Sequence, residues 1–178
     1  MKSHFRLLLL VLLLVAPVLA QDQQSAVSPK AEERIQREVR HQLVMLPRLS
    51  VFDNLAYKVD GYNVTLLGTV SNPVNKSDAE NAVKRIEGVE KVDNQIEVLP
   101  PSPMDDRLRL RLYRAIYGYP PLQKYALPVI KPIRIIVKGG HVTLEGVVDN
   151  EGDKTIAGIR ARGVPGSFSV TNNLVVAK

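Results

Sequence analysis

The sequence predicts an α+β protein made of two tandem units, each folded in the order α-β-β-α-β, behind an N-terminal signal peptide. The first reason is a strand motif, Gly61 to Val70, that returns 78 positions later as Gly139 to Val148. In both copies apolar residues alternate with other residues after a glycine turn, which is the period of a half-buried strand. The second reason is that apolar residues at helical spacing flank each copy. Each unit is therefore expected to hold a three-stranded mixed sheet covered by two helices.

The repeat extends over most of both units. Residues 55–98 and 133–176 share 14 identities in 44 positions, which fall on turns and on inward-facing apolar positions. Gly68 and Gly146 occupy the same position inside the repeated strand. A glycine weakens a strand unless backbone or a packed side chain must come close to it. We therefore expect a larger residue at either position to clash with the covering helix or a neighbouring strand.

The first 20 residues have the composition of a secretory signal peptide. Lys2 and Arg6 precede an apolar run from Leu7 that ends with small residues before Gln21. A membrane anchor would need about 20 apolar residues to cross the bilayer core, so cleavage after Ala20 is expected. The chain has no cysteine, which excludes a lipoprotein anchor, disulfides and thiolate metal sites. We expect a periplasmic protein, exported by a cleavable signal peptide and without a lipid anchor.

The rest of the chain divides at changes of composition. Residues 21–28 are polar and aperiodic, so a short disordered leader is expected before the first unit at 29–99. Ser28 and Pro29 are typical of a capped helix start, and Pro47 of a helix stop. Prolines predict a stiff linker at 100–103. The second unit, 104–178, is expected to contain helices at 104–117 and 151–163 and strands at 133–138, 142–148 and 168–176.

Two segments of the second unit look irregular. Prolines between residues 119 and 132 exclude regular structure in the loop before its first strand. Gly152, Gly158 and Gly163 weaken its second helix, each by up to about 1 kcal/mol relative to alanine.

Few side chains are candidates for catalysis or metal binding. His41 and His141 remain after signal removal, and neither has acidic residues or cysteines clustered near it in the sequence. Asp105 and Asp106 are adjacent acids, but acids in the first turn of a helix are favoured by the helix dipole. Gly139 and Gly140 precede a strand and form no phosphate-binding loop. We predict no enzyme activity, no cofactor, and no catalytic or metal-ligating residue.

A family resemblance follows from the motifs taken together. Both units carry Gly-x-x-Val-Thr-Leu-x-Gly-x-Val, and Gly88, Val92, Asn94 and Ile96 follow in the first copy, with residues 164–174 matching in the second. An exported chain with two such units resembles the BON-domain proteins. The resemblance implies a periplasmic or envelope protein connected with osmotic stress, outer-membrane integrity or phospholipid binding. It implies no catalytic constellation.

The helix at 104–117 is the candidate binding element. Leu108, Leu112 and Ile116 share the expected core face, whereas Leu110, Tyr113 and Tyr117 cluster on the other side. Arg107 and Arg114 flank that second stripe. Aromatic and leucine side chains edged by arginine are typical of a membrane-surface or protein contact. We predict a membrane- or partner-binding site formed by Arg107, Leu110, Tyr113, Arg114 and Tyr117; alternatively, the stripe packs on the first unit or under the proline-rich loop.

The charge balance favours an anionic partner. After removal of Lys2 and Arg6 the chain keeps 22 basic against 18 acidic residues, a net charge of +4. This charge suits an anionic phospholipid surface and gives weak grounds for nucleic acid, which an exported protein rarely meets. We expect a non-catalytic envelope protein that binds anionic phospholipid or other envelope surfaces and supports envelope integrity under osmotic stress. The alternative is a periplasmic chaperone or scaffold that binds unfolded or assembling envelope proteins.

Overall fold

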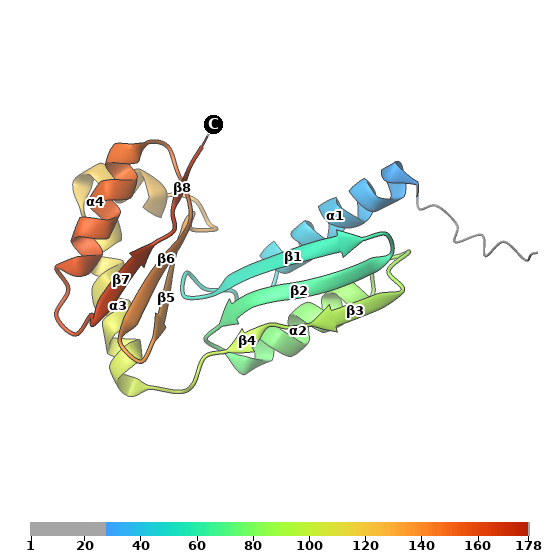
Figure 1. Cartoon of the computed structure of the whole chain (residues 1–178), viewed down its shortest axis with the longest axis horizontal. Helices are drawn as coiled ribbons and strands as arrows, with labels where there is room; N and C mark the ends of the chain where they lie inside the picture. The colour runs from blue at the N-terminus through green and yellow to red at the C-terminus, as the bar shows by residue number, and fades with distance from the viewer. Residues whose placement is uncertain (1–27, 178) are drawn as a thin grey trace, which may run out of the picture.

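The computed structural model describes residues 28–177, and the predicted signal peptide and all but the last residue of the predicted leader lie outside this range. Two α+β units follow one another along the chain, which confirms the predicted fold class (Figure 1). The elements of the first unit are α1 (Pro29–Val44), β1 (Asn54–Asp60), β2 (Asn63–Val70), α2 (Pro73–Lys84), β3 (Lys91–Asn94) and β4 (Glu97–Val98). Those of the second unit are α3 (Pro103–Tyr117), the 3-10 helix η1 (Pro120–Ala126), β5 (Ile133–Lys138), β6 (His141–Val148), α4 (Glu151–Arg162), β7 (Ser169–Asn172) and β8 (Val175–Val176).

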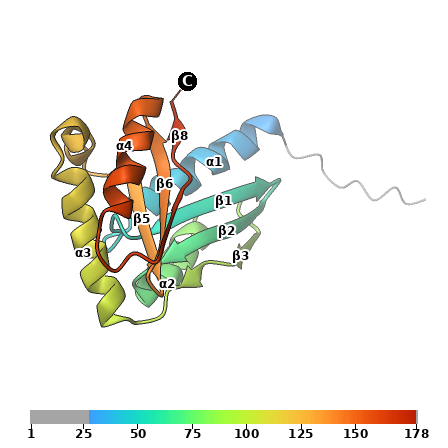
Figure 2. The same cartoon turned by 60° about the vertical axis from the view of Figure 1, so that its left-hand side comes forward.

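Both sheets are mixed and have the same strand order. In the first unit β2 is central, antiparallel to β1 and parallel to β3 and β4. In the second unit β6 is central, antiparallel to β5 and parallel to β7 and β8. Two helices cover one face of each sheet, and a view from another side shows α3 and α4 together on the second sheet (Figure 2). Between residues 28 and 177 no helix is long and apolar enough to cross a membrane.

The alternating strands supply the cores. Val64, Leu66 and Val70 are buried on β2 and pack beneath α1 and α2. Their counterparts Val142, Leu144 and Val148 on β6 are buried in the second core. The period-2 pattern therefore identified the correct face of each central strand.

The third strand of each unit is broken into two pieces by a repeated asparagine. Asn94 Oδ1 accepts a hydrogen bond from the Ile96 N–H, 3.2 Å away, and its Nδ2 donates to the Lys76 carbonyl. This local bond turns the Ile96 side chain into the core. Asn172 bonds in the same way to Leu174, so the strands predicted as continuous are each interrupted at this asparagine.

The loop before β5 is more regular than predicted. Pro120 and Pro121 begin the 3-10 helix η1, so the expectation that prolines exclude regular structure there is wrong. Proline is compatible with the first turn of a helix, because its fixed φ suits that position and its missing N–H would have no partner there. Leu122 and Tyr125 on η1 are buried and extend the second core.

Within residues 28–177, three of the four α-helices begin at a side-chain cap. Asn72, Ser102 and Asn150 accept hydrogen bonds from backbone N–H groups in the first turns of α2, α3 and α4. Ser28 precedes α1, but its side chain makes no such bond, contrary to the prediction. The caps fix where α3 begins relative to the strands, and this position determines which of its residues are exposed.

Candidate functional site

The start of α3 is tied to the hairpin between β5 and β6. Ser102 accepts a hydrogen bond from the Asp105 N–H, and the buried Asp105 carboxylate accepts from the N–H groups of Gly139 and Gly140, each at 2.8 Å. Gly139 and Gly140 have φ values of 59° and 78°, which glycine adopts without strain. Asp105 therefore holds the hairpin turn against the helix.

Phe168 lies beside this turn. Its N–H donates to the Gly140 carbonyl at 2.9 Å, and its ring lies so close to Gly140 that a Cβ there would be 2.6 Å from the ring. A hollow of about 340 Å³ opens between Phe168, the hairpin and α3, where Met104, Arg107 and Arg111 line it. The hollow is mainly apolar with two guanidinium groups at its wall.

A row of exposed side chains continues from the hollow along α3. We call this surface the basic–apolar face; it consists of Met104, Arg107, Leu110, Arg111, Arg114 and Phe168. Met104 is 69%, Leu110 50% and Phe168 76% exposed, and the three arginines are also exposed. A single exposed apolar residue is ordinary, but several together with charges between them are typical of an interaction site.

Among the described residues, the arginines of this face have no acidic partner. None of the ion pairs formed within residues 28–177 includes Arg107, Arg111 or Arg114. Arg109, on the opposite side of the same helix, is buried, pairs with Asp106 and donates to the Val137 carbonyl at 2.7 Å. The helix therefore carries one structural arginine and three that remain available to an external anion.

The predicted site residues do not all lie on this face. Arg107, Leu110 and Arg114 are exposed there as expected, and Tyr113 is half-buried. The expectation that Tyr117 belongs to the exposed stripe is wrong, because Tyr117 is 4% exposed and donates its hydroxyl hydrogen to the Ile133 carbonyl at 2.5 Å. Burial raises the pKa of Tyr117, so the hydroxyl remains protonated and keeps this bond.

Sequence reasoning missed Met104, Arg111 and Phe168. Arg111 lies one helical turn after Arg107, so the i, i+4 spacing could have placed both on one face. Phe168 stands where the first unit has Glu90, and an apolar residue in place of an acid at a repeated turn was a second available signal. Met104 and Phe168 lie on the same hollow because Asp105 binds the β5–β6 turn, and helical or strand periodicity in the sequence cannot predict this long-range contact.

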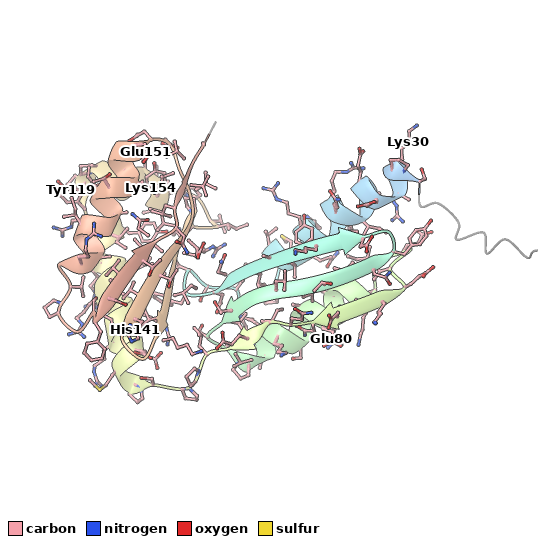
Figure 3. The ribbon with its side chains drawn as sticks, viewed as in Figure 1. Lys30, Glu80, Tyr119, His141, Glu151 and Lys154 are labelled. Carbon is pink, nitrogen blue, oxygen red and sulfur yellow. The ribbon has the colours of Figure 1, made fainter. Side chains whose placement is uncertain are left out.

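The two histidines among the described residues lie outside the basic–apolar face. His141 is exposed at the start of β6, where its Nδ1 lies 2.8 Å from the Ser169 hydroxyl (Figure 3). His41 is exposed near the end of α1. The part of the chain that the structure describes contains no cluster of three or more metal-ligating side chains.

The sequence model of the BON domain matches residues 31–100 and 122–178, one region in each unit. The chain belongs to the BON domain family. BON domains are in general envelope or phospholipid-binding modules, and their proteins are generally non-catalytic. They are typical of periplasmic or envelope proteins. In this BON-domain chain α3 lies between the two matched regions, so the basic–apolar face combines residues of that intervening helix with Phe168 of the second matched region.

The other comparisons add no functional information. Among solved structures, CdsD, a structural protein of the type III secretion system of Chlamydia trachomatis, has 14% sequence identity and a TM-score of 0.28 over 82% of this chain and 94% of that chain. The C-terminal domain of CdsD has 14% identity and a TM-score of 0.27 over 80% of this chain and 96% of that chain. No curated protein matches the sequence.

Proposed function

We propose that the protein binds anionic phospholipid surfaces of the cell envelope through the basic–apolar face of α3, catalyses no reaction, and supports envelope integrity under osmotic stress. The observation that carries the proposal is the juxtaposition of three arginines without acidic partners and three exposed apolar side chains. The general role of BON domains and the net positive charge support the same partner.

Two energetic terms act at such a surface. Each arginine near anionic headgroups contributes about 1 kcal/mol, and this attraction decays within a Debye length. Insertion of Met104, Leu110 and Phe168 among the headgroups adds an apolar term of up to about 1.5–3 kcal/mol per fully buried side chain. Binding should therefore be reversible, weakened by salt, and not abolished by it.

The test is flotation of the protein with vesicles of phosphatidylglycerol and phosphatidylcholine, compared with vesicles of phosphatidylcholine alone. We expect the double variant Arg107→Glu/Arg114→Glu to lose most binding while it remains folded, because both side chains lie outside the core. The matched control is Lys30→Glu/Arg37→Glu, which makes the same change of charge on exposed residues of α1 in the first unit.

Loss of binding in the α3 variant but not in the α1 variant supports the proposal. Equal loss in both shows that only net charge matters, and full binding by both shows that α3 is not the contact. If no vesicle binding occurs and the protein instead suppresses aggregation of unfolded proteins, the chaperone role replaces the lipid role.

A further inference from the structure

The loop between α1 and β1 covers one edge of the second sheet. The Ile135 N–H of β5 donates to the Val51 carbonyl at 2.9 Å, and the Arg134 guanidinium donates to the Ser50 carbonyl at 2.9 Å. The side chains of Val51 and Phe52 pack against the second core. The first unit therefore caps an edge strand whose backbone groups would otherwise face solvent.

The counterpart edge in the first unit has no such cap. Tyr57 on β1 corresponds to Ile135, 78 positions later, and it pairs with Leu66 as Ile135 pairs with Leu144. The Leu66 carbonyl accepts from the Gln95 N–H on the far side of β2, so Tyr57 directs its own N–H to the outer edge. Within the described part of the chain, no group accepts a hydrogen bond from that N–H.

Side-chain burial differs at the two edges in the same way. On β5 the inward-facing residues Ile133, Ile135 and Val137 are each 0% exposed. Their counterparts on β1, Leu55, Tyr57 and Val59, are only half-buried. The first edge therefore keeps apolar surface that the second edge has covered.

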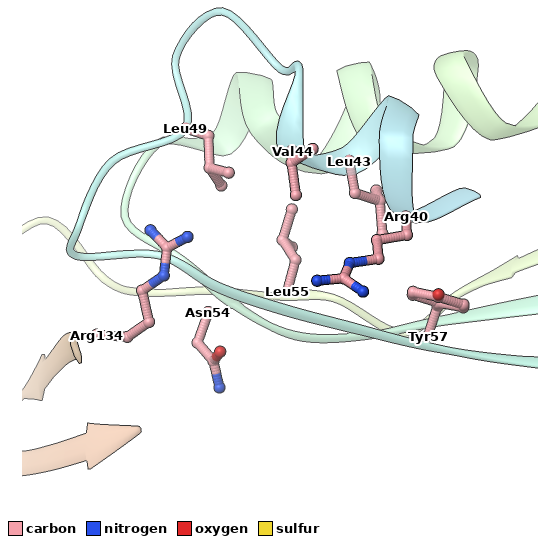
Figure 4. A pocket seen from close by; sticks show the side chains of 8 residues that line it. All are labelled: Arg40, Leu43, Val44, Leu49, Asn54, Leu55, Tyr57 and Arg134. Carbon is pink, nitrogen blue, oxygen red and sulfur yellow. The ribbon is translucent and has the colours of Figure 1, made fainter. Parts of the chain in front are cut away.

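A cavity of about 380 Å³ opens beside the uncapped edge, between α1 and β1 (Figure 4). Val44, Leu49, Leu55 and Tyr57 of the first unit line it with Arg40, and Arg134 of β5 lines it from the second unit. Aligning the buried triad of α1 (Ile35, Val39, Leu43) with that of α3 (Leu108, Leu112, Ile116) places Val44 opposite Tyr117. The smaller valine leaves open the space that a tyrosine fills in the second unit.

The second unit carries a copy of the capping loop that covers no sheet edge, although Val129 and Ile130 share a hollow with Leu49 and Val51 of the first unit. Residues 127–130, Leu-Pro-Val-Ile, stand 78 positions after residues 49–52, Leu-Ser-Val-Phe. Leu127 is 84% and Val129 97% exposed, whereas the corresponding Val51 packs on the second core. The Val129 carbonyl accepts no hydrogen bond from any residue in 28–177.

We propose that residues 127–130 of one copy dock on the outer edge of β1 in a second copy, with the Val129 carbonyl accepting from the Tyr57 N–H. The contact repeats between molecules the cap that joins the two units within a molecule. In this association each copy uses its loop on one neighbour and its β1 edge on another, so the contact is head-to-tail and open-ended, in contrast to a reciprocal two-fold dimer. Ala56 stands where Arg134 donates to Ser50, so the contact between copies lacks one hydrogen bond and should be reversible.

The first experiment is sedimentation of the protein over a dilution series. We expect the average mass to rise with concentration beyond that of a dimer. Val129→Asp should raise the dissociation constant by about tenfold or more, because it buries an unpaired charge in the contact. The matched control is Ile159→Asp, which adds the same charge at a 57% exposed isoleucine of α4 and should leave association unchanged.

Complementation tests the head-to-tail geometry. Tyr57→Pro removes the edge N–H and should therefore also prevent chain growth. The variant should still fold, because proline is tolerated on an edge strand where the N–H that it replaces faces outward. A mixture of Val129→Asp, which keeps its edge, and Tyr57→Pro, which keeps its loop, should form dimers and stop there. If both variants are folded and their mixture does not associate, the proposal is overturned. It is also overturned if the average mass of the unmodified protein stops rising at the mass of a dimer.

Amide hydrogen exchange of the unmodified protein provides a measurement that does not depend on the folding of Tyr57→Pro. Exchange of the Tyr57 N–H should slow as concentration rises, and this slowing should be absent in Val129→Asp. An exchange rate that does not depend on concentration overturns the proposal, whether the amide is fast and uncovered or slow and covered by the same chain.

Discussion

At the scale of single residues, the repeated strand glycines are required by both backbone conformation and space. Gly68 and Gly146 have φ values of 104° and 113°. A Cβ at Gly68 would lie 2.0 Å from the Asn54 carbonyl oxygen, and one at Gly146 would lie 1.9 Å from that of Pro132. The predicted clash with a neighbouring strand is confirmed, and its partner is backbone just before or at the start of β1 and β5, which cannot rotate away.

Gly146→Ala should therefore destabilise the second unit by about 2–5 kcal/mol, from backbone strain and steric overlap together. Gly139→Ala is the control in the same hairpin: its φ of 59° is also positive, but a Cβ there meets no atom within 4 Å. It should cost only about 1–2 kcal/mol. Chemical denaturation of both variants measures the difference, and equal losses would show that steric overlap contributes nothing.

At the scale of secondary-structure elements, each unit buries an aspartate near the start of its second helix, but the aspartate comes from a different element in each unit. In the first unit the loop residue Asp53 accepts hydrogen bonds from Ser71 and from Asn75 of α2. In the second unit the acid is on the helix, where Asp153 takes the place of Asn75. It accepts from the Tyr125 hydroxyl at 2.6 Å and pairs with Lys124 at 2.8 Å. The insertion that forms η1 supplies both partners.

This arrangement predicts a pH dependence. The Lys124 ammonium and then the Tyr125 hydroxyl hold the pKa of Asp153 below its usual value. The ionised carboxylate therefore stabilises the second unit above the ordinary aspartate pKa of about 4, and that stability is lost as pH falls through the lower folded pKa. Asp153→Asn, which restores the residue of the first unit, should lose less stability on acidification than the parent.

Thermal unfolding midpoints between neutral pH and about pH 3 give the comparison over the range where carboxylates titrate. Asp60→Asn, at an exposed hairpin position, should retain the parent's pH dependence. A parental acid response in Asp153→Asn would contradict the assignment.

The element scale also shows what the sequence could and could not predict. Helical spacing placed Leu108, Leu112 and Ile116 in the core, because burial follows directly from the 3.6-residue period. The same helical wheel placed Tyr117 on the exposed side. Its burial could not be predicted, because its hydrogen-bond partner, the Ile133 carbonyl, follows a loop whose path no local pattern determines. Phe168 lies 58 residues after Leu110 at the centre of α3, and only tertiary packing brings it beside that helix.

At the scale of the whole molecule, the two proposed surfaces are separate. The basic–apolar face lies on α3, whereas the docking loop and the β1 edge lie on the segment before β5 and on the first unit (Figure 1). A head-to-tail chain of copies would present several α3 faces to one membrane. Weak individual contacts would then act together without any new contact between protein and lipid.

The most direct test of the central claim is the environment of a fluorophore on α3 in the presence of lipid. Because the chain has no cysteine, Leu110→Cys can be labelled at that position alone with a polarity-sensitive dye, and Ile159→Cys on α4 serves as the control. Anionic vesicles should shift the emission of the Leu110 label to the blue and leave the Ile159 label unchanged, whereas phosphatidylcholine vesicles should shift neither. An unchanged Leu110 label on protein that floats with anionic vesicles would contradict the account.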